Sequence, residues 1–261
     1  MNTNRFHLKQ IAFPREHGSW GYTLEPLALA LLVAFSVNGL LLAFVTFLIF
    51  LAHQPVRIIF NKKLNNKFRT KAFPIFLLYA ISAMVLLFMV LIELSFYQLL
   101  PFFISVIIMS GYLLLELNNV KRNIVTELLA AVSVGLIATN VVLIIGWNWA
   151  YAAAFWTVIL SRAIPTTFYV RSKLQIAKKQ PPQELSVFVS SFASLLIVSI
   201  LSYFLYLPLL SIAAVLMLIG RAYIGIYKSA GKVNVKKLGI MEFVYGIVFV
   251  LLVAVGYNFG I

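Results

Sequence analysis

The sequence predicts an all-α integral membrane protein, and three observations support this prediction. Of its 261 residues, 62% are hydrophobic and only 11% are charged, and the mean hydropathy is +1.00. A water-soluble core of ordinary size cannot hide that much apolar surface. The apolar residues also fall into runs of about 20, the length that a helix needs to cross roughly 30 Å of hydrocarbon.

Nine such runs follow one another along the chain, and we expect each to form one transmembrane helix of a helical bundle. The expected helices cover residues 21–36, 39–60, 73–92, 97–117, 124–145, 149–170, 185–204, 207–223 and 239–257. Val37, Asn38 and Gly39 are expected to form a tight turn between the first two. The segment before the first run has no apolar stretch and no small-residue cleavage site, so we expect no removable signal peptide. We expect residues 1–261 to form one membrane domain.

The basic residues lie on one side of this predicted topology. All 21 Lys and Arg fall before the first helix or in and beside four alternate connections. Because Lys and Arg concentrate on the cytoplasmic side of membrane proteins, we expect a cytoplasmic N-terminus and a C-terminus outside. The same rule explains the net charge of +14. We therefore expect a lipid bilayer, and no nucleic acid, as the partner of this charge.

Short segments recur at nearly equal separations along the chain. An Asn-Val-Lys motif with a further basic residue precedes both Glu127 and Glu242 by the same distance, and the ends of the second and sixth helices resemble each other. Such recurrence is typical of membrane proteins built from two related halves, although short matches also arise by chance. The expected halves are about residues 39–145 and 149–257.

Polar side chains gather at the ends of the second and sixth predicted helices, where helical spacing places most of each group on one face. Ionisable groups at membrane depth are costly and usually face the bundle interior or a water-filled cavity. We therefore expect them to bind an anion, the alternative being that the arginines snorkel to the lipid head groups. These residues are His53, Arg57 and Asn61 in the second helix and Arg162, Tyr169, Arg171 and Lys173 in the sixth.

The segment just before the first helix is the densest in polar groups beside the membrane. Residues 14–22 (PREHGSWGY) combine Arg15 and His17 with two glycines that allow close backbone approach. Two interpretations stay open at this point. The segment is either part of a functional site, with Arg15 binding an anion, or an interfacial anchor with Trp20 and Tyr22 at head-group level.

Three glutamates, Glu25, Glu127 and Glu242, are expected in the first turn or two of their helices, where the helix dipole favours a carboxylate. His17, Glu25 and Glu127 are also the candidate catalytic bases. The chain has no Cys and no Asp, and its three His are far apart in sequence. With no cofactor motif present either, we expect neither a metal site nor a cofactor.

Three motifs carry a resemblance to a known family. They are PREHGSWG before the first helix, Gln54-Pro55 with Arg57 at the end of the second, and residues 162–171 (RAIPTTFYVR) at the end of the sixth. With these motifs the whole chain resembles the YwiC-like family of uncharacterised bacterial membrane proteins. The nine-helix plan more distantly resembles the UbiA superfamily of intramembrane prenyltransferases. That resemblance implies a UbiA-like bundle with a cytoplasm-facing cavity, in which two Asp-rich motifs hold magnesium and an isoprenoid diphosphate.

The chain departs from the UbiA pattern where that superfamily binds magnesium. Arg57 and Asn61, and then Arg162, Arg171 and Lys173, stand where the Asp-rich motifs are expected. Because magnesium prefers carboxylate oxygens, magnesium-dependent prenyl transfer is not expected unless the three glutamates have taken over this role. Arginine and lysine instead bind a phosphate or carboxylate directly.

We therefore expect a basic, cytoplasm-facing cavity that binds an anionic amphiphile, an isoprenoid diphosphate or a membrane lipid. A prenyltransferase-like reaction stays open at this point. A membrane transporter and a non-catalytic membrane subunit are the alternatives, and the scarcity of polar residues in the outer half counts against a transport path. The oligomeric state is not indicated by the sequence.

Overall fold

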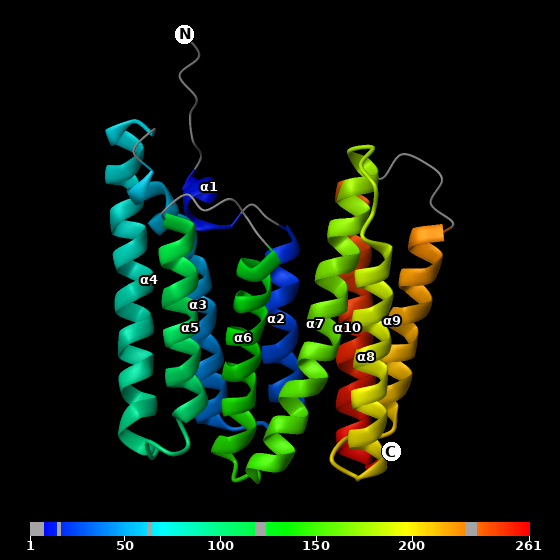
Figure 1. Ribbon diagram of the computed structural model, residues 1–261. Coiled ribbons are helices and arrows are strands. Elements are labelled where there is room, and N and C mark those ends of the chain that lie inside the picture. Colours follow the sequence, from blue (N-terminus) through cyan, green and yellow to red (C-terminus); the bar gives the residue numbers. More distant parts are fainter. Residues whose placement is uncertain (1–7, 15–16, 62–63, 118–123, 228–233) are drawn as a thin grey trace.

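The computed structural model describes residues 8–14, 17–61, 64–117, 124–227 and 234–261. Within these ranges the chain forms ten helices and no strand. In chain order they are α1 (Leu8–Ala12), α2 (His17–Val33), α3 (Val37–Phe60), α4 (Asn66–Glu93), α5 (Leu100–Leu117), α6 (Ile124–Ile144), α7 (Trp149–Ala177), α8 (Glu184–Tyr203), α9 (Leu210–Tyr227) and α10 (Val235–Phe259). Figure 1 shows α2 to α10 running side by side as a bundle, with α1 at one end.

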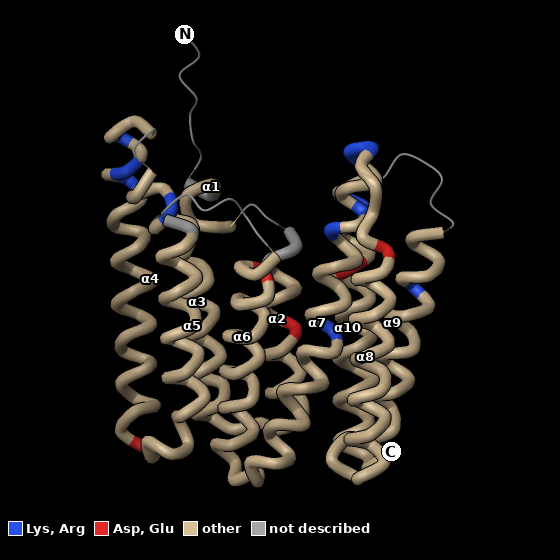
Figure 2. The backbone as a smooth tube through the Cα atoms, viewed as in Figure 1, with Lys and Arg blue, Asp and Glu red and all other residues tan. Residues whose placement is uncertain are grey.

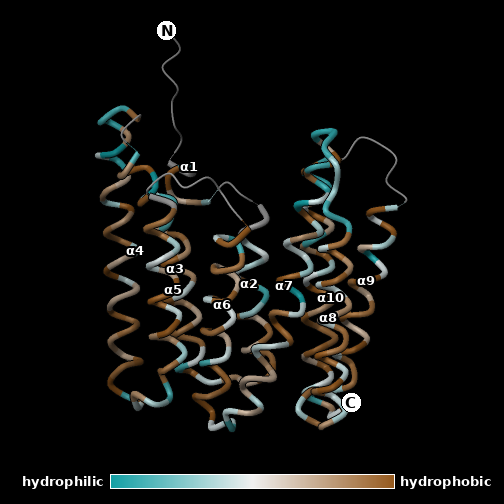
Figure 3. Tube along the Cα trace, in the orientation of Figure 1, coloured by the Kyte–Doolittle hydropathy of each residue, from teal (hydrophilic) through white to brown (hydrophobic). Residues whose placement is uncertain are grey.

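Each predicted apolar segment forms a helix, from α2 to α10. Six helices of the described chain, α3, α4, α6, α8, α9 and α10, are long and apolar enough to cross a membrane. Large apolar side chains are exposed on them, among them Leu78, Met84 and Phe88 of α4. Figure 3 shows hydrophobic positions along the middle of the bundle. The chain is therefore a multi-pass α-helical membrane protein.

The helix boundaries differ from the predicted ones. Val37, Asn38 and Gly39 do not form the predicted turn but open α3, because the Ser36 hydroxyl accepts a hydrogen bond of 3.0 Å from the Gly39 amide and caps the helix. At the other end of the bundle, α4, α7, α9 and α10 extend past the predicted spans into the basic segments. Lys, Arg and Gln are good helix formers, so hydropathy marks the end of the apolar part and not of the helix.

The helices from α3 onward form two groups of four, with α2 between them. In the first group, α3 packs against α4 and α6, and α5 packs against α6. In the second, α8 packs against α7 and α9, and α9 packs against α10. The central helix α2 contacts α6 and α3 on one side and α10 on the other, and α7 crosses from the first group toward the second (Figure 1).

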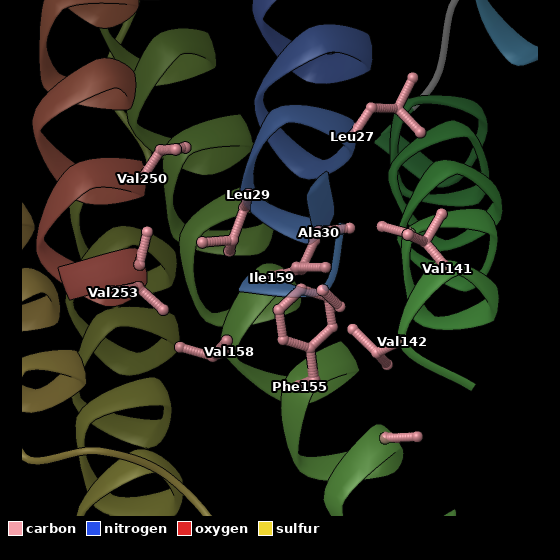
Figure 4. Packing of buried hydrophobic residues seen from close by; sticks show 14 of the residues in the cluster. Leu27, Leu29, Ala30, Val141, Val142, Phe155, Val158, Ile159, Val250 and Val253 are labelled. Atoms are coloured by element: carbon pink, nitrogen blue, oxygen red, sulfur yellow. The ribbon is translucent and has the colours of Figure 1, made fainter. Parts of the chain in front are cut away.

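Close apolar packing holds α2 in this position. Leu29 and Ala30 of α2 are almost fully buried and belong to one cluster with Phe155 and Val158 of α7 and Val253 of α10. Figure 4 shows these side chains meeting between the helices. Because lipid tails are as apolar as these residues, tight van der Waals contact rather than exclusion of water favours the association.

Charge is distributed unequally between the two ends of the bundle. Figure 2 shows most Lys and Arg of the described chain toward one end, where α4 begins and α7 ends, with others part-way along α7 and α9. We call this end the basic end. At the opposite end, Glu93 of α4 accepts a hydrogen bond of 2.9 Å from the side-chain amide of Asn38. This distribution agrees with the one-sided charge expected from the sequence.

Candidate functional site

Two ion pairs are buried between α2, α7, α9 and α10. Arg162 of α7 donates from Nε and Nη2 to the two carboxylate oxygens of Glu25 of α2, at 2.8 and 2.9 Å. These side chains are only 8% and 12% exposed. Arg221 of α9 donates from Nη1 to Oε2 of Glu242 of α10, at 2.5 Å. Each pair joins one positive and one negative group, so the four charges cancel inside the bundle.

Thr166 of α7 connects the two pairs. Its hydroxyl oxygen accepts hydrogen bonds from Arg162 Nη1 at 2.9 Å and from Arg221 Nη2 at 3.5 Å. Arg162 Nη2 also donates to the backbone carbonyl of Glu242, at 3.1 Å. Charges in an apolar interior are stable only when they are paired and hydrogen-bonded. We call Glu25, Arg162, Thr166, Arg221 and Glu242 the central network.

Aromatic rings cover both guanidinium groups. The central carbon of the Arg221 guanidinium lies 4.5 Å from the ring centroid of Tyr169 and 5.6 Å from that of Tyr245. The same atom of Arg162 lies 6.0 Å from the ring centroid of Phe249. Aromatic faces attract cations, and they do so more strongly where water is excluded. These rings therefore add cation–π contacts to the ion pairs of both guanidinium groups.

Two glycines make room for the network. A Cβ atom at Gly246 of α10 would collide with the Glu25 carboxylate and with Arg162 Nη2. Gly225 of α9 gives the same kind of room to the hydroxyl of Tyr169. Small residues at these two positions are what allows α9 and α10 to approach the polar side chains of α2 and α7.

A cavity of about 630 Å³ lies beside the central network, between α2, α6, α7 and α10. Along α7 its wall runs from Ile159 to Leu174, which corresponds to about 20 Å of helix. Lys236 contributes to the wall near the basic end, and the apolar side chains of Leu29 and Val250 line the opposite, deep end.

The charged part of the cavity wall is supplied by the central network. Glu25, Arg162, Thr166 and Glu242 line the cavity, whereas Arg221 is not among its lining residues in the described chain. The cavity is therefore amphipathic, with charge in its middle and at the basic end and an apolar section beyond. Such a cavity suits an elongated molecule with a polar head and an apolar chain.

A third ion pair joins α6 and α7 nearer to the basic end. Arg171 Nε donates to Glu127 Oε2 at 2.7 Å, and the two side chains are partly exposed. Glu127 lies in the first turn of α6, as predicted. Glu242 lies about two turns into α10, at the limit of the prediction, and Glu25 lies just beyond the first two turns of α2, because this helix begins earlier than the apolar run.

The predicted anion-binding residues on α7 all have partners within the protein, and of the four only Arg162 is among the described residues that line the cavity. Arg162 belongs to the central network, Tyr169 faces Arg221, and Arg171 forms the third ion pair. Lys173 is buried and donates from Nζ to the carbonyl of Gly225 at 2.9 Å. The basic character expected for the cavity is thus largely balanced by glutamates.

The predicted residues on α3 lie apart from this group. His53 packs its ring 6.1 Å from that of Tyr112, Arg57 is exposed, and Asn61 is the C-cap of α3. None of these three is among the described residues that line the cavity. Arg15 lies outside the described residues, as does the side chain of His17, the first residue of α2.

Two members of the central network, Thr166 and Arg221, are not predicted as site residues from the sequence. Arg221 lies near the end of an apolar run and therefore looks like one more cation of the basic segments, and Thr166 carries no charge. One feature of the sequence does indicate that such residues belong to a site. The apolar segments contain glutamates as well as arginines, and such groups must find partners at membrane depth.

The carboxylates do not gather into a metal site in the part of the chain that the structure describes, where no three His, Cys, Asp or Glu side chains come together. Glu25, Glu127 and Glu242 stand on three different helices, and each pairs with an arginine. The described geometry therefore does not support these glutamates as replacements for the Asp-rich motifs of the UbiA superfamily.

The profile of the family described as YwiC-like protein matches residues 13–142, about half of the chain. The chain belongs to the YwiC-like family. The matched part of this YwiC-like chain contains Glu25 and Glu127, while their partners Arg162 and Arg171 lie beyond it. No curated protein and no solved structure matches the chain significantly.

Removal of Arg162 leaves Glu25 charged and without its partner inside the bundle. We expect Arg162→Met to lower the free energy of unfolding by about 3–5 kcal/mol. Adding Glu25→Gln to this variant removes the uncompensated charge and recovers much of the loss. Unfolding of the purified protein in mixed micelles with increasing SDS measures both changes. Arg171→Met, at the more exposed pair, serves as the comparison. An equal loss of unfolding free energy in that variant would contradict the explanation that burial makes the Arg162 pair more important.

The collision at Gly246 gives a second prediction. Gly246→Ala places a methyl group against the Glu25–Arg162 pair, and we expect a loss of about 1–3 kcal/mol because a tightly packed site does not accept the added volume. A Cβ atom at Gly239 of the same helix meets no atom within 4 Å. Gly239→Ala is therefore expected to be neutral or to stabilise by up to about 1 kcal/mol through helix propensity. The same unfolding measurement compares the two, and equal effects would refute the steric explanation.

Proposed function

We propose that this YwiC-like membrane protein binds one anionic amphiphile, an isoprenoid diphosphate or a phospholipid-like molecule, in the cavity between α2, α6, α7 and α10. The head group lies beside Arg162, within reach of Lys236, and the apolar chain extends toward Leu29 and Val250. The observation that carries this proposal is the amphipathic wall, which joins a charged middle section to an apolar end within one continuous cavity.

The volume and length of the cavity support a ligand of this class. A space of about 630 Å³ lies in the range of sites that enclose a small lipid chain or a drug-sized molecule. A soluble polar metabolite would leave the apolar section around Phe249 and Val250 unfilled. A purely apolar molecule would leave the charged groups of the wall without a polar partner.

We also propose that all nine helices from α2 to α10 span the bacterial cell membrane, with the basic end in the cytoplasm, the C-terminus outside and a UbiA-like arrangement. The one-sided Lys and Arg support this orientation. The two groups α3–α6 and α7–α10 support a pseudo-repeat of residues 39–145 and 149–257, with α2 as the additional helix.

A prenyltransferase-like reaction is the second candidate. One observation favours this reaction over transport, namely that Glu25 and Arg162 line the same cavity. Glu25 is the candidate base, and Arg162 would stabilise the diphosphate leaving group. Product formed from an isoprenoid diphosphate and an acceptor in the presence of excess chelator would support this extension. A lack of turnover with a donor that does bind would leave binding as the function.

Filling the cavity tests the binding proposal. Gly239 lines the cavity, and a Cβ atom there meets no atom within 4 Å, so we expect Gly239→Phe to fill part of the ligand volume. We expect at least about tenfold weaker photo-crosslinking of a labelled isoprenoid diphosphate or anionic lipid, which corresponds to about 1.4 kcal/mol. The matched control is Gly111→Phe on α5, which also has open space and does not line the cavity. Equal labelling of both variants and of the native chain would argue against the cavity as the binding site.

The absence of cysteine from the chain makes the orientation directly testable. Ser95 is exposed just after α4, and Lys178 is exposed at the C-cap of α7 at the basic end. In intact cells we expect a membrane-impermeant maleimide to label Ser95→Cys but not Lys178→Cys, because only the first faces outward. Permeabilised cells should label both. Labelling of Lys178→Cys alone in intact cells would reverse the proposed orientation.

A further inference from the structure

The guanidinium of Arg162 is already occupied by groups of the protein. It has five N–H donors, and four hydrogen bonds use them: two to Glu25, one to Thr166 and one to the carbonyl of Glu242. At most one N–H group is left for a ligand. The two-bond fork with which arginine binds phosphate or carboxylate is held by Glu25. A ligand oxyanion can therefore bind this edge of the guanidinium only if Glu25 no longer accepts these two hydrogen bonds.

Charge balance sets a second condition. The two buried ion pairs have no net charge, and an added oxyanion would bring a net negative charge into a region from which water is largely excluded. Such an unbalanced charge is costly. A proton taken up by the displaced Glu25 carboxylate restores neutrality, because the carboxyl group is then uncharged. The ligand and one proton together can replace the carboxylate at no net change in buried charge.

The surroundings of Glu25 identify it as the group that takes the proton. Facing charged groups are Arg162 on α7, Arg221 on α9 and Glu242 on α10. Tyr22, on the same helix as Glu25, lines the same cavity. Glu242 is held by Arg221, which is not among the described cavity-lining residues. Glu25 lines the cavity and pairs with an arginine that also lines it.

The two remaining neighbours of α2 place their charged groups elsewhere. On α6, Glu127 pairs with Arg171 toward the basic end. On α3, the ring of Phe50 contacts Trp20 of α2, and His53 and Arg57 lie further along α3 toward the basic end. Lys236 of α10 lines the cavity near that end.

We propose that Glu25 is an internal competitor of the ligand, so that the cavity takes up an oxyanionic amphiphile together with one proton. The proton comes from the buffered bulk solvent and forms an O–H bond on the Glu25 carboxylate. Two N–H···O hydrogen bonds from Arg162 to Glu25 are exchanged for two to the ligand head group, and no other covalent bond changes. This inference rests on the proposed function, because it assigns a regulation to the same binding site.

The test measures binding as a function of pH with probes of constant charge. A fluorescent phosphatidylglycerol carries a phosphodiester whose charge does not change from acidic to mildly alkaline conditions. A fluorescent diacylglycerol of the same chain length is the uncharged control, and an isoprenoid phosphodiester is the second anionic probe. All three are titrated into the purified full-length protein in detergent micelles.

We expect at least one anionic probe to bind more tightly as the pH falls, by up to about tenfold per pH unit, since one proton is taken up with each ligand. The uncharged control should show no such slope. Binding of the phosphatidylglycerol probe would identify the ligand as a membrane lipid, and binding of the isoprenoid probe would identify it as an isoprenoid. Binding of an anionic probe without pH dependence overturns the inference and leaves the proposed function standing, whereas failure of both anionic probes to bind at any pH overturns the proposed function itself.

Glu25→Gln tests the assignment to one residue. The amide carries no charge and leaves the Arg162 fork free for the ligand, so we expect tight binding of the anionic probe at every pH. Glu93→Gln, at the opposite end of the bundle, makes the same chemical change and should keep the native pH slope. A slope retained in a folded Glu25→Gln protein overturns the proposal. If that variant does not fold, the native chain with charged and uncharged probes still decides between the outcomes.

Discussion

The bidentate pair between Glu25 and Arg162 is the constraint on which the arrangement of this bundle depends. An unpaired charge inside a membrane protein is costly, so neither residue tolerates the loss of the other. The pair joins α2, which lies between the two helix groups, to α7, which crosses from one group to the other. Gly246 of α10 is part of the same constraint, because only a residue without a side chain leaves space for the paired groups.

The pair also determines what kind of cavity the protein has. Positive residues alone would make a site that attracts any anion, whereas here each arginine of the central network is balanced by a glutamate. A charge-balanced wall beside an apolar section discriminates more strongly, because a ligand must offer hydrogen bonds that are as good as those it displaces. The same residues thus join the helices of the bundle and set a condition on which ligand can enter the cavity.

The sequence predicts the helices well and the site only in part. Composition and run length identify every helix from α2 to α10, because lipid demands an apolar surface whatever the neighbours are. Boundaries such as the start of α3 at Val37 depend on a single capping bond and are missed. Arg162 and Glu25 are recognised as candidates separately, since each is a charge in an apolar segment. His53 and Arg57 are grouped with Arg162 by an apparent repeat, yet α3 packs mainly against α4 and α6.

By itself the sequence determines that this chain is a helical membrane protein with its Lys and Arg on one side, because both properties follow from the transfer of local segments between water and lipid. Only the tertiary structure decides which charges neutralise one another. Glu25 and Arg162 are 137 positions apart in sequence, and no local pattern encodes their contact. The basic cavity expected from composition therefore becomes a charge-balanced one, since pairing depends on which helices meet in three dimensions.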